Sequence, residues 1–162
     1  MRKLIITTLA LLAASAPAVA HGPQTQTTIS IGMADTLVNA AAKEAEARKL
    51  GLAIVVVDEQ GSIVLARRMD GALPHSFEIA RRKAMTSALT RQPTKVIQDA
   101  VAKGDSAILA IDNMMPIEGG LPVFHGGRVV GAIGVSGAPS HMDAAVAQAG
   151  VDALAAHTAG GR

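Results

Sequence analysis

The sequence contains no cysteine, no tryptophan and no tyrosine, and it has only two phenylalanines among its 162 residues. The absence of cysteine excludes thiol nucleophiles, iron–sulfur clusters, cysteine-ligated zinc and covalently attached c-type haem. The scarcity of aromatic side chains leaves little on which nucleic-acid bases could stack. These absences remove several large classes of enzyme and binding protein before any motif is considered.

The chain also lacks a strong excess of either charge. It has 15 basic and 13 acidic residues, and two of the basic ones, Arg2 and Lys3, lie in a segment with the features of a secretory signal. An apolar run, Leu4–Ala14, follows them, and Ala18-Val19-Ala20 matches a cleavage site. We therefore expect residues 1–20 to be a signal peptide that is removed after Ala20, so that the mature protein is periplasmic or extracellular.

Loss of this segment removes two basic residues and leaves 13 of each sign, which is not the basic footprint of a nucleic-acid-binding protein. No other apolar run is long enough to predict a membrane span. We expect residues 21–30 to form a flexible N-terminal arm and residues 31–158 to form a single domain.

Periodicity and turn residues predict the secondary structure of this domain. Helical patterns cover residues 31–50, Ser76–Thr90, Pro93–Lys103 and about 140–158, with Ser76 and Ser140 as candidate caps. Apolar runs typical of strands cover Leu52–Val57, Ser62–Arg68, Ser106–Ile111, Leu121–Phe124 and Val129–Val135. The order helix, two strands, two helices, three strands, helix predicts an α+β fold in which helices flank a five-stranded antiparallel sheet.

The last two strands belong to a glycine-rich stretch, Gly119–Gly137. Gly126 and Gly127 between the two apolar runs predict a tight hairpin, and the second run carries glycines at 131, 134 and 137. Glycines within a strand mark close approach of a helix, another backbone or a ligand. The spacing fits neither the G-x-G-x-x-G dinucleotide loop nor the G-x-S-x-G nucleophile elbow, which excludes those two kinds of site.

Polar side chains that could bind an anion follow one line of the predicted helix Ser76–Thr90. His75, Ile79, Arg82 and Thr86 share this line, and Lys83 is adjacent. Such a row can bind a carboxylate or a haem propionate through charge-assisted hydrogen bonds. The alternative is a solvated basic face, which is common on surface helices.

Three histidines, His75, His125 and His141, are candidate iron ligands. None has the H-x-x-x-H or H-E-x-x-H spacing of a preformed zinc site. His75 and His141 lie beside predicted helix starts and His125 lies in the hairpin turn, and for each histidine taken alone these positions favour a surface or capping role.

Several short motifs, in order along the chain, resemble the GlcG/HbpS family, which includes extracellular haem-binding proteins and the C-terminal domain of PduO-type proteins. The matching segments are Arg67-Arg-Met-Asp-Gly71, Ser76, Lys83-Ala84-x-Thr86, Pro93-Thr94, Gly119-Gly120-Leu-Pro122, Val130–Gly137, Asp143 and Ala149-Gly150. The resemblance implies an oligomer of five-stranded antiparallel domains and, in some members, haem binding with iron- or redox-linked roles outside the cytoplasm.

The resemblance and the residue pattern together lead to three hypotheses. In the first, the chain is an exported haem-binding protein rather than an enzyme, with an iron ligand among His75, His125 and His141. In the second, it is an enzyme or sensor that binds a small organic acid. In the third, it is an accessory homo-oligomer without a small ligand. The candidate cofactor-binding residues are His75, Arg82, Lys83, Thr86, Gly119, Gly120, His125 and His141.

Overall fold

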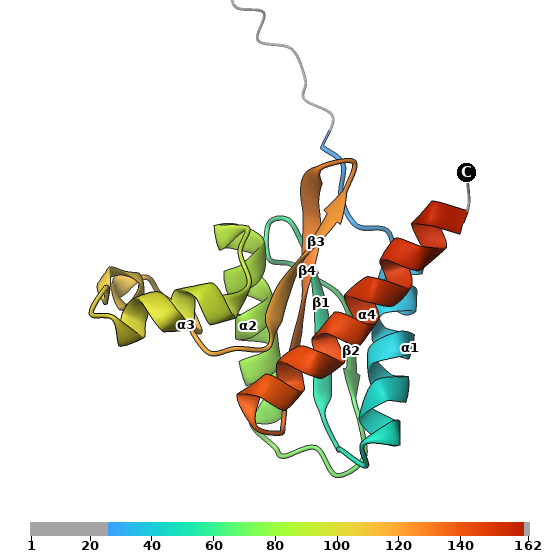
Figure 1. Ribbon diagram of the computed structural model, residues 1–162, viewed down its shortest axis with the longest axis horizontal. Coiled ribbons are helices and arrows are strands. Elements are labelled where there is room, and N and C mark those ends of the chain that lie inside the picture. Colours follow the sequence, from blue (N-terminus) through green and yellow to red (C-terminus); the bar gives the residue numbers. More distant parts are fainter. Residues whose placement is uncertain (1–25, 161–162) are drawn as a thin grey trace, which may run out of the picture.

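The fold is built on a four-stranded antiparallel sheet, seen in a computed structural model that describes residues 26–160 (Figure 1). The strands are β1 (Ala53–Asp58), β2 (Ile63–Arg68), β3 (Gly120–His125) and β4 (Arg128–Ser136), in the spatial order β2-β1-β4-β3. The predicted signal peptide, residues 1–20, lies outside the described residues, as do the first five residues of the predicted arm.

The central position of β1 explains its unbroken apolar sequence. The residues from Ala53 to Val57 are all buried, because β2 and β4 flank the strand and helices cover both of its faces. Register pairs Ala53 with Ser136 and Asp58 with Gly131. The end of β4 that leads into the last helix therefore lies at the opposite end of the sheet from the turn between β1 and β2.

Helices cover the two faces of the sheet unequally. Helices α1 (Ile31–Ala47) and α4 (Ser140–Gly160) pack on one face, over a core that includes Leu37, Ile54 and Ile133. Helix α2 (Ser76–Thr90) packs on the other face, where its small residues Ala80, Ala84 and Ala88 contact Val55, Val57 and Ala132. The predicted α+β class is confirmed.

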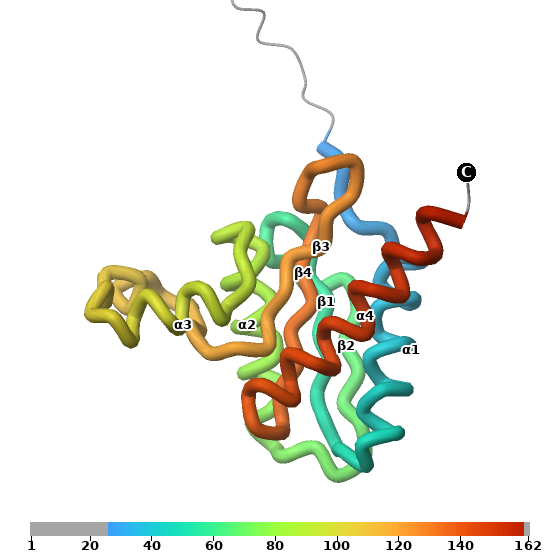
Figure 2. The backbone as a smooth tube through the Cα atoms, in the orientation of Figure 1, coloured from blue at the N-terminus to red at the C-terminus, as the bar shows by residue number. Residues whose placement is uncertain are grey.

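The predicted fifth strand, Ser106–Ile111, is wrong. These residues contain a 3-10 helix, η1 (Ala107–Ala110), which follows helix α3 (Thr94–Ala102). Figure 2 shows that α3 leads the chain away from the sheet, so the segment has no strand edge with which to pair. A short apolar run cannot by itself distinguish a strand from another apolar segment.

The glycine-rich hairpin is present, and its glycines serve close packing of α2 and neighbouring backbone. A Cβ added to Gly134 would lie 2.1 Å from the carbonyl oxygen of Ala80, and one added to Gly131 would lie 2.3 Å from that of Val57. The segment that leads into α1 also packs against this strand, because Ile29, two residues before the helix, is buried and its N–H donates to the carbonyl of Val130.

Candidate functional site

A cavity of about 410 Å³ opens where the first turns of α2 and α4 meet the end of β4. Its lining residues are Leu73, His75, Ser76, Ile79, Lys83, Ile117, Ser136, Gly137, Ala138, Pro139, Ser140 and Asp143. Two other hollows in the described residues, of about 580 and 550 Å³, are lined by none of the predicted site residues. The cavity at the helix starts is therefore the candidate site.

The cavity has an apolar side and a polar side. Leu73 and Ile117 line it while remaining 50% and 42% exposed, and Ile79 and Pro139 add further apolar surface. Three serines, Ser76, Ser136 and Ser140, contribute hydroxyl groups. Apolar walls with a few polar groups that fix orientation are typical of sites for small molecules and cofactors.

A buried ion pair closes the floor of the cavity. Lys83 Nζ on α2 lies 2.8 Å from Asp143 Oδ2 on α4, and each side chain is only 2% exposed. Lys83 also donates to the carbonyl of Val135, and the amide of Ala138 donates to Asp143 Oδ1. The ammonium of Lys83, predicted as a ligand-binding group, is thus engaged inside the protein and is not part of a solvated basic face.

Burial is the main influence on the carboxyl of Asp143, and it raises the pKa of that group above its ordinary value. The hydrogen bond and charge of Lys83, together with the amides of Ala138 and Gly137, offset part of this increase. The pair places no net charge at the floor of the cavity, because its two charges cancel.

Gly119 and Gly120, two further predicted site residues, pack against Lys83. A Cβ on Gly119 would lie 2.8 Å from Lys83 Nζ, and one on Gly120 would lie 2.4 Å from the Lys83 carbonyl oxygen. The N–H of Gly120 donates to Thr94 Oγ1. Both glycines therefore let the start of β3 approach α2 closely.

Arg82 and Thr86 hold the segment that precedes β3. Arg82 Nη2 donates to the carbonyl of Met114 at 3.1 Å, and the amide of Met115 donates to Thr86 Oγ1 at 2.7 Å. Thr86 in turn donates to the carbonyl of Arg82. These two predicted site residues anchor the backbone of residues 113–115, which leads on to the cavity-lining Ile117.

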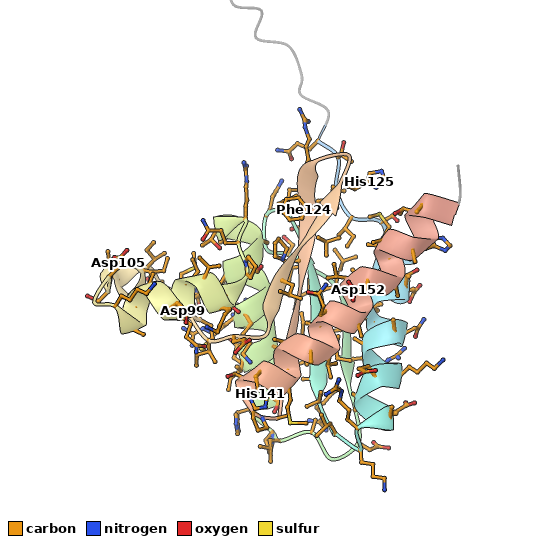
Figure 3. All side chains as sticks on the ribbon, in the orientation of Figure 1. Asp99, Asp105, Phe124, His125, His141 and Asp152 are labelled. Atoms are coloured by element: carbon orange, nitrogen blue, oxygen red, sulfur yellow. The ribbon has the colours of Figure 1, made fainter. Side chains whose placement is uncertain are left out.

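The three candidate histidines do not come together. His75 lines the cavity, and His141 follows the lining residue Ser140 in the first turn of α4. His125 lies on the β3–β4 hairpin at the other end of the sheet from His141 (Figure 3). Among residues 26–160, no three histidine, aspartate or glutamate side chains form a set that could hold a metal ion.

Ser136 is not among the site residues predicted from the sequence, and Ser76 is predicted only as a candidate cap and as part of the family resemblance. The prediction that Ser76 caps the helix is wrong, because Ser76 is the first residue of α2 and His75 occupies the cap position. The side chain of His75 makes no capping hydrogen bond. In the sequence, Asp143 is predicted only as part of the family resemblance. A sequence signal for the burial of Lys83 was present in its small neighbours Ala80, Ala84 and Ser87, which mark the packed face of α2.

Among residues 26–160, every helix falls short of the length and hydropathy that crossing a lipid bilayer requires.

Comparison with known proteins identifies the family. Residues 29–152 match the family described as "Haem degrading protein HbpS-like". Protein GlcG of Escherichia coli K12 is 35% identical over 113 residues, which are 70% of this chain and 84% of GlcG. A crystal structure of a double mutant of Streptomyces reticuli HbpS has a TM-score of 0.78 and 33% identity, covering 88% of this chain and 99% of that one.

A second similar structure was determined with a ligand. The crystal structure of a PduOC–haem complex has a TM-score of 0.71 and 26% identity, covering 78% of this chain and 94% of that chain. These TM-scores show that both structures share the fold of this chain, and the family match covers most of the described residues. The chain belongs to the HbpS-like family.

Proposed function

We propose that this protein binds haem in the cavity between the first turns of α2 and α4. The observation that carries the proposal is the presence of His75 on a partly apolar cavity in a member of a family whose relatives include a haem complex. An imidazole nitrogen is a common axial ligand of haem iron. Leu73, Ile79 and Ile117 provide apolar surface against which a porphyrin could pack.

The described residues are compatible with haem in this cavity, but fewer of them would contact the haem than the sequence indicated. His75 is the candidate axial ligand, and His141, next to the lining residues, is the alternative. Haem, when bound, supplies an iron centre that accepts such a nitrogen. Lys83 keeps the cavity floor in place through its ion pair with Asp143, and Arg82 and Thr86 position the wall that contains Ile117.

Titration of the purified protein with hemin tests the proposal. We expect a stoichiometric shift of the Soret band that is weakened in His75→Ala and unchanged in His125→Ala, the matched control at the other end of the sheet. A Soret band that persists with time indicates binding alone, and one that decays in the presence of reductant and oxygen indicates degradation. Absence of any shift in the unaltered protein would contradict haem binding.

We also propose export as part of this function. The support is the segment ending at Ala18-Val19-Ala20, which has the charge, apolar run and cleavage site of a secretory signal. Expression of the full chain in a bacterium should yield a periplasmic or secreted product that begins at His21. N-terminal sequencing of each cell fraction tests this, and an intact N-terminus in all fractions would argue against it.

Self-association is the third part of the proposal. The segment from α3 through Ile117, here called the α3 arm, exposes the apolar side chains Val96, Leu109, Ile111 and Ile117. Within α3 itself only Thr94 is fully buried, and the described part of the chain leaves Val96 exposed and Ile97 and Val101 half-buried. The arm also carries charges of both signs, such as Lys95 and Asp99, which suits contact with a second copy of the same surface.

A further inference from the structure

Ser76 has an unusual environment for a buried hydroxyl group. Its side chain is fully buried, its Oγ makes no hydrogen bond to any other described residue, and the residue lines the candidate cavity. A buried hydroxyl without a partner costs free energy, so native structures nearly always satisfy such groups. A hydrogen-bond acceptor in the cavity would remove this cost.

Ser76 lies at a helix start that also lacks a cap. Helix α2 spans 15 residues, and no side chain accepts a hydrogen bond from its first turn. The first N–H groups of a helix have no acceptor within the helix and carry a partial positive charge. The N–H of Ser76 donates to the carbonyl of Leu73, so the donors of this turn without an acceptor in the described residues are the N–H groups of Phe77 and Glu78.

A second helix start meets the same cavity. Helix α4 spans 21 residues, and its preceding residue Pro139 and first residue Ser140 both line the cavity. The carbonyl of Pro139 accepts from the amides of Met142 and Asp143. The N–H of Ser140 is one of the first N–H groups of α4, which have no acceptor within the helix. Two helix dipoles thus direct their positive ends at one space.

The nearby carboxylate of Asp143 does not oppose an anion in this space. Lys83 neutralises it at 2.8 Å, and its other oxygen is engaged by the amide of Ala138. The cavity therefore combines hydroxyl and amide donors and positive dipoles at one end with the apolar side chains of Leu73, Ile79 and Ile117 along its side.

We propose that the polar end of the cavity, formed by Ser76 and the first turns of α2 and α4, binds a carboxylate group. A carboxylate accepts several hydrogen bonds and carries the negative charge that helix N-termini favour. It could belong to a haem propionate, in which case the inference rests on the proposed function, or to a free small organic acid with an apolar body. Both sources present the same group to the same donors.

Paired ligands distinguish the two sources. Hemin is compared with hemin dimethyl ester, in which both propionates are esterified, and lactate is compared with the uncharged lactamide. Hemin affinity is measured from the Soret shift, and acid binding is measured as the rise in melting temperature at millimolar ligand. Each measurement is repeated on Ser76→Ala and on Ser62→Ala, a matched control in the turn at the opposite end of the sheet.

We expect Ser76→Ala to weaken binding of the carboxylate ligand about tenfold or more, which corresponds to loss of one hydrogen bond to a charged group. Ser62→Ala should bind as the unaltered protein does. Because the hydroxyl of Ser76 has no hydrogen-bond partner among residues 26–160, Ser76→Ala should fold normally, and its urea unfolding curve verifies this.

The possible outcomes separate this inference from haem binding itself. If the unaltered protein binds hemin more tightly than the diester and Ser76→Ala binds the two equally, the result supports a propionate site. A melting shift with lactate that is lost in Ser76→Ala, without any Soret shift from hemin, supports a small-acid site and refutes the haem function. Equal binding of hemin and its diester, with no effect of lactate, overturns the carboxylate site while the haem function stands. No binding of any of these ligands overturns both.

Discussion

Lys83 and Asp143 form an ion pair between helices that pack on opposite faces of the sheet. Lys83 lies on α2 and Asp143 on α4, and their charged atoms are 2.8 Å apart at the end of β4, where Gly119 leaves room for them. Desolvation of two charges offsets much of their attraction, so a buried pair of this kind is not by itself a source of net stability. The pair instead holds the first turns of α2 and α4 in place relative to one another, and these two turns line the cavity.

Removal of one partner of this pair should be strongly destabilising. Lys83→Met leaves the carboxylate of Asp143 buried without a cation, and we expect a loss of about 3–5 kcal/mol in the free energy of unfolding. Lys83→Met with Asp143→Asn should recover a large part of this loss, since the amide can still accept from Ala138. Urea unfolding of both single variants and the double variant measures the coupling. Additive losses would show that the two side chains act independently.

Gly134 should tolerate no side chain, because α2 packs directly on its Cα. Gly134→Ala places a methyl group 2.1 Å from the carbonyl oxygen of Ala80 and 2.5 Å from the amide nitrogen of Ala84, so backbone must move. We expect a loss of about 1–3 kcal/mol in the free energy of unfolding.

Gly32 provides the matched control for this substitution. It lies in α1 with no atom within 4 Å of an added Cβ, and Gly32→Ala should raise the free energy of unfolding by about 0.5 kcal/mol. Chemical denaturation of the two variants under the same conditions tests the contrast. A stable Gly134→Ala protein would mean that α2 does not contact β4 as closely as described.

The hydroxyl of Thr86 should control the order of the segment before β3. Thr86→Val removes the acceptor of the Met115 amide, and we expect a loss of about 1–3 kcal/mol together with faster hydrogen exchange at Met115. Thr90→Val is the control, since Thr90 Oγ1 bonds only to the Thr86 carbonyl one turn away. Equal exchange at Met115 in both variants would contradict this role.

The sequence was sufficient to predict most of the fold. The bounds of helix Ser76–Thr90 agree with the structure, and the two hairpins follow from turn residues and apolar runs, which are local signals. The prediction of a fifth strand was wrong because it was based on the strand-like composition of Ser106–Ile111 alone. Whether this segment can pair with another strand depends on where α3 directs the chain.

The site was harder to predict, because its groups are far apart in sequence. The spacing along helix Ser76–Thr90 located His75 and Lys83 near one another, but the partner of Lys83 is 60 residues away. The unsatisfied hydroxyl of Ser76 is a property of tertiary packing, and no pattern in the sequence distinguishes it from an ordinary helix cap. For the same reason, Gly119 and Gly120 were interpreted as ligand contacts, whereas they pack against Lys83.

The α3 arm should mediate self-association, because its apolar side chains are exposed on a segment that extends from the rest of the chain. Leu109, which is 57% exposed, is the test position, and Leu109→Lys should shift the protein from its assembled form toward monomer in sedimentation velocity. Ile31→Lys is the control, since Ile31 is equally exposed but lies at the start of α1. A charge at an exposed site should leave the monomer folded, so circular dichroism should be the same for both variants. An unchanged sedimentation coefficient in Leu109→Lys would exclude this residue from the interface, and dissociation by Ile31→Lys instead would place the contact on α1.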